Sequence, residues 1–96
     1  MAKTFINGGD VDKIQVTVGD SGKSDIRFRV TGDTKGKEAD VELEIKVIHT
    51  DGNSEVIIKK FGITKKKNKC TGFCEFSVPY EVSNVKILRG SVTRTL

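Results

Sequence analysis

Residues 39 to 48 read A-D-V-E-L-E-I-K-V-I, and this stretch decides the fold class. Its apolar residues occupy every second position from Ala39 to Val47, and acidic or basic residues fill the positions between them. Side chains on a β-strand alternate between two faces, so the pattern predicts a strand with one face on a core and the other in water. A helix would need apolar residues three and four positions apart, and Glu or Lys interrupts each such stripe here.

The same alternation predicts strands over Lys13–Val18, Asp25–Val30 and Phe73–Val78, and a final strand over Val82–Leu96. Clusters of Gly, Asp, Ser and Asn separate these stretches and are typical of turns. Pro79 follows the third of them and ends it, because proline donates no hydrogen bond to a strand ladder.

The stretch Val56–Ile63 also predicts a strand, but its apolar residues fall on both parities. Val56 and Ile58 lie on one, and Ile57, Phe61 and Ile63 lie on the other. This pattern predicts either a bulge near Lys59 and Lys60 or a strand that is buried on both faces for part of its length.

Short strands with turn signals about every ten residues, and no sustained helical periodicity, predict an all-β fold. We expect an antiparallel β-sandwich of about six to eight strands, immunoglobulin-like in layout, with a small barrel as the alternative. Residues 1–12 are expected to be a loose segment, to which Phe5 and Ile6 could add an edge strand, and residues 13–96 to form a single domain. The predicted core comprises Val16, Ile26, Phe28, Val30, Val41, Leu43, Ile45 and Phe76.

The chain has 96 residues and a formal net charge of +4, which fits one soluble domain with a modest core. This charge is mild, and no nucleic-acid partner is expected because such partners call for a dense basic stripe. The first residues lack the hydrophobic core of a signal peptide. Either the protein is cytosolic or a leader has been removed.

The two cysteines, Cys70 and Cys74, bear on the cellular compartment. If the backbone between them is extended, their Cα atoms lie about 13 Å apart, and a disulfide needs less than about 7 Å. A turn at Thr71 and Gly72 would bring them together. A disulfide would imply an oxidising, extracytoplasmic compartment, and reduced thiols would fit the cytoplasm.

Catalysis is not expected. His49 is the only histidine and sits beside the Asp51-Gly52 turn, and no nucleophile motif surrounds any serine. His49, Cys70 and Cys74 make three potential zinc ligands without the paired short spacings of a structural zinc site.

Calcium is the one metal that the sequence suggests, because acidic residues recur in or beside the turns. Hard cations bind several oxygens that converge from loops, and a sandwich gathers its loops at two ends. Acidic residues also favour turns for reasons of backbone geometry alone. The candidate ligands are Asp20, Asp33, Glu38 and Asp51.

Four lysines lie within five residues, at Lys65, Lys66, Lys67 and Lys69, and Phe61 and Phe73 flank this segment. An exposed basic loop with nearby aromatic residues is typical of contact with an anionic membrane surface. Lysines also protect strand edges against aggregation, and a solvated loop is the simplest interpretation of such a run.

Residues 13 to about 92 resemble the PLAT (lipoxygenase-homology) β-sandwich domain of lipoxygenases, pancreatic-type lipases and polycystins. The residues that carry the resemblance are Ile14–Asp20, Ile26–Val30, Gly32–Ala39 with the following V-E-L-E-I, Glu75–Val78 and Val82–Arg89. The resemblance implies a non-catalytic module that docks to a membrane or a partner protein, in some cases with the help of calcium bound in its loops.

A second resemblance is to the FxLYD-type sandwich of bacterial surface proteins. An alternating strand that ends at Asp51-Gly52, and a later Phe76-Ser77-Val78 before the closing strand, carry it. This resemblance implies a structural or accessory domain of an extracytoplasmic protein.

Overall fold

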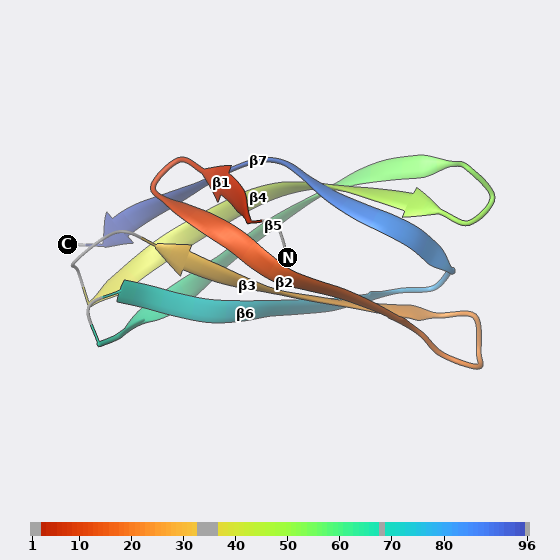
Figure 1. Cartoon of the computed structure of the whole chain (residues 1–96), viewed down its shortest axis with the longest axis horizontal. Coiled ribbons are helices and arrows are strands. Elements are labelled where there is room, and N and C mark those ends of the chain that lie inside the picture. The colour runs from red at the N-terminus through yellow and green to blue at the C-terminus, as the bar shows by residue number, and fades with distance from the viewer. Residues whose placement is uncertain (1–2, 33–36, 68, 96) are drawn as a thin grey trace.

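The computed structural model describes residues 3–32, 37–67 and 69–95, and over these residues the chain consists almost entirely of β-strands (Figure 1). The strands are β1 (Thr4–Ile6), β2 (Gly9–Val18), β3 (Ser24–Gly32), β4 (Glu38–His49), β5 (Ser54–Lys66), β6 (Lys69–Val78) and β7 (Val82–Thr95). All neighbouring strands pair antiparallel, in the order β1-β2-β3-β6-β5-β4-β7. The prediction of an all-β antiparallel fold is confirmed.

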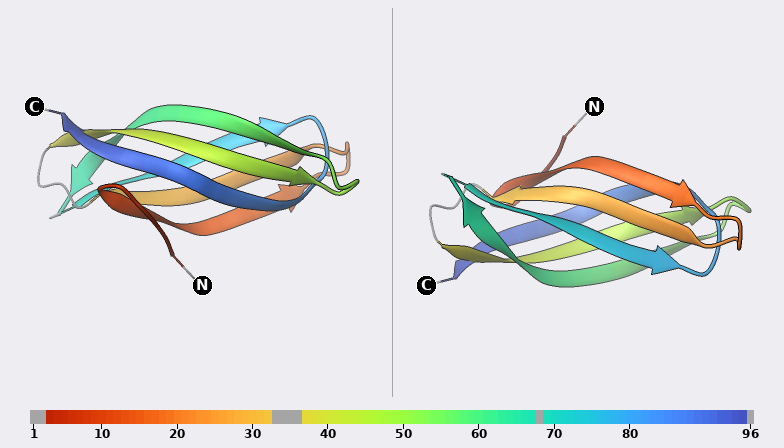
Figure 2. Two further views of the ribbon diagram at one scale, coloured as in Figure 1. Left: turned by 90° about the horizontal axis from the view of Figure 1, so that it is seen from above. Right: turned by 90° about the horizontal axis from the view of Figure 1, so that it is seen from below.

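The sheet curls until its two outer strands approach each other, which gives a nearly closed barrel (Figure 2). Asn7, just after β1, forms a parallel bridge to Ser91 of β7, with hydrogen bonds from Asn7 N to Gly90 O at 3.1 Å and from Val92 N to Asn7 O at 2.8 Å. The sandwich arrangement is not confirmed, because hydrogen-bonded pairing joins all seven strands into one sheet. The layout lies closer to the barrel alternative.

The core fills the space inside this curled sheet. Six of the eight predicted core residues are buried, and Val16 and Phe76 are half-buried against them. The Phe28 ring meets the Phe76 ring edge to face, with centroids 6.4 Å apart. The buried apolar residues are Val11, Ile26, Phe28, Val30, Ala39, Val41, Leu43, Ile45, Val47, Ile63, Cys70, Cys74, Val78, Val82 and Val85.

Strands β4 and β5 pair in one unbroken register, from Glu38 opposite Thr64 to Ile48 opposite Ser54. Neither prediction for residues 56–63 is therefore right. There is no bulge against β4, and the strand is not buried on both faces. Its odd positions face the core, and the outward-facing Val56 and Ile58 remain 53% and 59% exposed.

The pairing of β5 with β6 is short. It is confined to Thr64 opposite Thr71, Lys65 opposite Cys70 and Lys66 opposite Lys69. Beyond these pairs the two strands diverge, β5 with β4 and β6 with β3 (Figure 1). The edge of β5 from Ser54 to Gly62 consequently has no strand paired to it in the described part of the chain.

Residues 9–12, which the expected loose segment includes, begin β2. Val11 is fully buried and Asp12 nearly so. Glycine serves close packing here, because a Cβ at Gly9 would lie only 2.2 Å from the carbonyl oxygen of Thr31. Gly8 makes the turn before it with a φ of 87°, a conformation that side chains disfavour.

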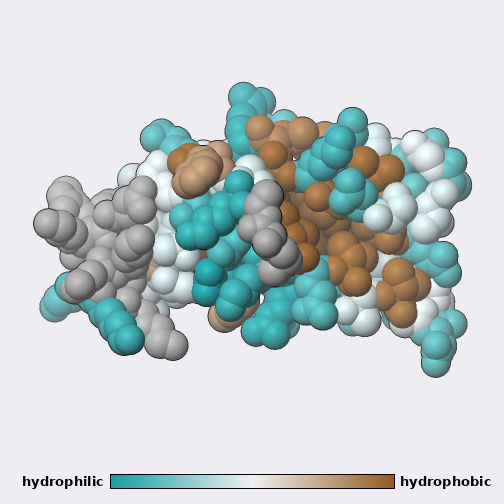
Figure 3. Space-filling model, in the orientation of Figure 1, coloured by the Kyte–Doolittle hydropathy of each residue, from teal (hydrophilic) through white to brown (hydrophobic). Residues whose placement is uncertain are grey.

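Apolar residues show at the surface between β2 and β7, on the right-hand half of the face in Figure 3. Ile14 and Val16 of β2, and Ile87 of β7, lie half-buried against the core. Val18, which continues the apolar alternation of Ile14 and Val16, is 46% exposed at the end of its strand. The strands are thus less tightly closed here than at Asn7, where hydrogen bonds join β7 to the end of β1.

Candidate functional site

The four lysines that were predicted to lie in an exposed loop instead lie at the end of the β5–β6 hairpin. Lys65 and Lys66 end β5, Lys69 begins β6, and Lys67 occupies the turn with a φ of 60°. Lys65 and Lys67 are exposed, whereas the side chains of Lys66 and Lys69 lie outside the described part of the structure. We call residues 65–69 the basic hairpin.

A further lysine joins the basic hairpin from a distant part of the sequence. The backbone N–H of Lys65 donates to the carbonyl oxygen of Lys37 at 2.8 Å, which places the exposed Lys37 beside it. Three exposed lysines therefore gather at one end of the molecule, whose longest dimension is 42 Å. Glu38, also exposed, is the acidic residue next to them in the chain.

The two phenylalanines that flank the basic segment do not join it. Phe61 packs against the core from the inner face of β5. Phe73 is 50% exposed on β6, and the guanidinium of Arg27 covers its ring at 4.3 Å from the centroid. The described part of the basic hairpin therefore offers charge without an aromatic anchor.

The predicted calcium ligands do not come together. Asp20 lies in the turn between β2 and β3, and Asp51 lies in the turn between β4 and β5. Both turns are at the right-hand end in Figure 1, whereas β4 begins, with Glu38, at the opposite end. β4 is twelve residues long, so about 36 Å separates Glu38 from the Asp51 turn. Asp33 lies outside the described residues. The part of the chain that the structure describes contains no group of three or more His, Cys, Asp or Glu side chains suited to a metal ion.

Asp51 has a local role in its own turn. Its carboxylate accepts hydrogen bonds from the backbone N–H of Asn53 at 2.9 Å and from the Asn53 side chain at 3.1 Å. These bonds, the backbone one above all, lower the pKa of Asp51. The carboxylate thus stabilises the tight turn in which Gly52 adopts a φ of 94°.

His49, at the end of β4, packs against the turn between β6 and β7. The His49 ring stacks on the Tyr80 ring with centroids 3.7 Å apart. The buried Nε2 of His49 and the hydroxyl of Tyr80 have no hydrogen-bond partner among the described residues. The hydroxyl of Ser24 lies nearby and makes two hydrogen bonds. It donates to the carbonyl oxygen of Tyr80 and accepts from the backbone N–H of Val82, both at 2.9 Å. These contacts connect the start of β3, the end of β4 and the turn between β6 and β7.

Cys70 and Cys74 both lie in the extended strand β6 and both are buried. No disulfide joins them, because an extended strand keeps their Cα atoms about 13 Å apart. Burial raises the pKa of the Cys74 thiol, which makes it less reactive than an exposed cysteine.

The outer face of β3 is held by charge pairs. Arg29 makes two hydrogen bonds to the nearly buried Asp12, at 2.8 and 2.6 Å, and this contact lowers the pKa of the Asp12 carboxyl. Arg27 lies 2.8 Å from Glu75 of β6. These pairs connect β2, β3 and β6 and leave Arg27 and Arg29 engaged.

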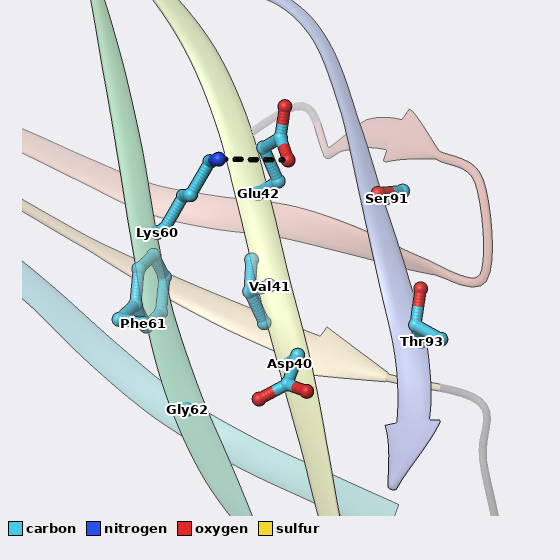
Figure 4. Close-up of a pocket in the computed structure, with 8 residues that line it drawn as sticks. All are labelled: Asp40, Val41, Glu42, Lys60, Phe61, Gly62, Ser91 and Thr93. Carbon is cyan, nitrogen blue, oxygen red and sulfur yellow. Dashed lines mark ion pairs between the residues drawn. The ribbon is translucent and has the colours of Figure 1, made fainter.

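A recess of about 400 Å³ lies on the outer face of β4, β5 and β7 (Figure 4). It forms where Gly62 has no side chain beside the larger residues of β4, and Lys60 reaches across it to Glu42 at 3.9 Å. Its lining is Asp40, Val41, Glu42, Lys60, Phe61, Gly62, Ser91 and Thr93. The recess offers carboxylates and hydroxyls to a small polar ligand, but no histidine, thiol or other strong nucleophile.

The unpaired edge of β5 is the feature that sequence reasoning missed. A signal for it was present, because Val56 and Ile58 break the alternation of their stretch without a bulge to explain them. They face outward beside an edge where hydrogen-bonding groups of the backbone lack strand partners.

Comparison of the chain with models of protein families, with curated proteins and with solved structures gives no match. Among the described residues, no helix has the length and apolar character needed to cross a membrane.

Proposed function

We propose that this protein is a non-catalytic binding module that docks onto an anionic membrane surface through its basic end. The observation that carries the proposal is the meeting of exposed Lys37, Lys65 and Lys67 at one tip of an elongated barrel. A tip that carries several lysines can approach a flat charged surface within the Debye length, about 8 Å at physiological salt.

The mode of docking follows from the position of the aromatic residues. Since Phe61 is in the core and Phe73 lies under Arg27, neither is available to insert between lipids beside the basic hairpin. Binding is then electrostatic and reversible, at about 1 kcal/mol for each lysine near charged lipid. The resemblance to PLAT domains points in the same functional direction.

Co-sedimentation with vesicles tests the proposal. The protein should sediment with vesicles that contain phosphatidylserine and not with pure phosphatidylcholine, and binding should fall as salt rises. The triple variant K37Q/K65Q/K67Q should bind on the order of 100-fold more weakly, since it removes about 3 kcal/mol. The quadruple variant K65Q/K66Q/K67Q/K69Q should likewise lose the preference for anionic vesicles.

A matched control separates a local site from overall charge. The variant K23Q/K46Q/K86Q removes the same charge at positions away from the basic hairpin and should retain most of the binding. E38Q removes the acidic residue beside Lys37 and should strengthen it. Equal loss in the control triple, or equal sedimentation with neutral vesicles, would overturn the proposal.

A further inference from the structure

The open edge of β5 has a defined hydrogen-bonding pattern. On the β4 side, the N–H of Lys65 donates to Lys37 O, and that of His49 donates to Asn53 O at 2.7 Å. Both pairs belong to the single register of β4 and β5, in which hydrogen-bonded pairs recur at every second residue. Odd-numbered residues of β5 therefore bond to β4. The N–H and C=O groups of Val56, Ile58 and Lys60 point to the open edge.

Other edges of the sheet are also incompletely paired. The edge of β6 beyond Thr71 has no register shift against β3 either, but the residues on its outer face are Phe73, which lies under Arg27, and the polar Glu75 and Ser77. β2 has a register shift between Asp12 and Gln15, where Lys13 adopts a φ of 53°, and the β7 ladder shifts between Glu44 and Ile45. Bulges of this kind discourage pairing with another chain. The β5 ladder has no shift, and its outer face carries the exposed Val56 and Ile58. A straight apolar edge is the kind that accepts an added strand.

The residues along this edge are complementary to themselves when the strand is reversed. Residues 55 to 59 read E-V-I-I-K, with an acid at one end, a base at the other and three apolar residues between. An antiparallel copy centred on Ile57 therefore sets Glu55 opposite Lys59 and Val56 opposite Ile58. Shifting the centre by one residue in either direction loses both charge pairings.

We propose that two copies of this chain associate through β5, antiparallel about a two-fold axis at Ile57, to form a sheet that continues through both barrels. Val56 of one copy and Ile58 of the other form a hydrogen-bonded pair, because both point their backbone groups to the open edge. Their exposed side chains then meet on the outer face.

The charge pairs fall where side chains come closest. Glu55 and Lys59 of the second copy form a non-hydrogen-bonded pair, whose Cα atoms lie about 4.5 Å apart. Lys59 already reaches across the opening between β5 and β6, with Nζ 4.8 Å from the centroid of the Phe76 ring. Its charge thus lies on the side from which the second copy approaches. A strand-to-strand contact of this length is small, so we expect a dissociation constant on the order of 10–100 µM.

Charge reversal tests both the association and its register. Sedimentation velocity of the whole chain from about 5 µM to 1 mM should show a dimer that grows with concentration. E55K and K59E each place like charges opposite one another twice per dimer, and each should weaken association by about tenfold. The double variant E55K/K59E restores opposite charges and should associate within about threefold of the parent.

A second test reads the register directly. In the proposed pairing the Cα atoms of residue 56 and residue 58 of the other copy lie about 5.5 Å apart, which suits a disulfide. The double variant V56C/I58C should form a covalent dimer under mild oxidation. V56C alone and I58C alone should not, because each introduced cysteine lies only diagonally, at about 7–8 Å, from the same residue of the other copy.

The controls keep each outcome decisive. Thermal melts confirm that every variant is folded, and the native cysteines of the parent, both buried, should give no covalent dimer under the same conditions. A parent that stays monomeric at 1 mM, a double reversal no better than the single ones, or cross-linking of V56C alone would each overturn the proposal. Vesicle binding through the basic hairpin should persist in E55K, so the two sites can fail independently.

Discussion

Strands β4 and β5 lie side by side in one unbroken ladder, yet their surroundings differ. β4 is paired along its length on both sides, with β5 and with β7, and its inward residues from Ala39 to Val47 are buried. β5 has a full partner on one side only, and its outward face carries two exposed apolar residues. The comparison shows that the number of paired sides, more than amino-acid composition, distinguishes the central strand β4 from β5, whose open edge is available for binding.

The largest effect that distinguishes the two strands should come from truncating one apolar residue in each. Leu43 of β4 is fully buried, so Leu43→Ala should lower the free energy of unfolding by about 2–5 kcal/mol. Ile58 of β5 is more than half exposed, and Ile58→Ala should change it by less than about 0.5 kcal/mol. Urea denaturation of dilute protein measures both. A Leu43→Ala protein as stable as the parent would contradict the described core.

The glycines opposite β4 make a second, smaller contrast. A Cβ on Gly90 of β7 would lie 2.5 Å from Cδ2 of Leu43 and 3.1 Å from the carbonyl oxygen of Glu42. Gly90→Ala should therefore cost about 1–3 kcal/mol by overpacking. A Cβ on Gly62 of β5 would meet nothing closer than Ala39 O at 3.9 Å, so Gly62→Ala should be nearly neutral. Equal melting temperatures for the two variants would show that β7 is less tightly packed on β4 than described.

The central strand was predictable because its two faces meet different environments along its whole length. The strand predicted for residues 39–48 is one residue longer at each end in the structure, and the predicted turn at Asp51-Gly52 is present. Each of these features is local, since alternation and turn chemistry depend on residues close in sequence.

The features that escaped prediction depend on contacts between residues far apart in the chain. Nothing near Gly9 shows that its backbone meets Thr31, and Lys37 joins the basic hairpin only through pairing with Lys65. The outward position of Val56 and Ile58 likewise follows from the register that β4 imposes on β5. A one-residue slip would have reversed both faces, and the local sequence of β5 alone does not choose between them.

The ion pairs on the outer face of β4 should give a still smaller effect. Glu44 contacts Arg89 of β7 through a short hydrogen bond that raises the pKa of Arg89, whereas Glu42 lies 3.9 Å from Lys60 of β5. Glu44→Gln should lower the melting temperature slightly, and Glu42→Gln should leave it unchanged. Because exposed pairs are screened, the difference should shrink in 1 M salt. A difference that persists at that salt concentration would point to packing and not charge.

The last contrast needs no substitution and no change in stability. In β5 the N–H groups of Ile57 and Lys59 donate to β4, while those of Val56 and Ile58 point to the open edge, as the bonds at Lys65 and His49 establish. Amide hydrogen exchange in dilute protein should therefore alternate along β5, slow at Ile57 and Lys59 and fast at Val56 and Ile58. In β4, where both sides are paired, exchange should be slow at odd and even residues alike.

Uniform protection along β5 at low micromolar concentration would mean that its edge is covered within the monomer. Protection of Val56 and Ile58 that appears only as concentration rises would mark the edge as the contact between copies.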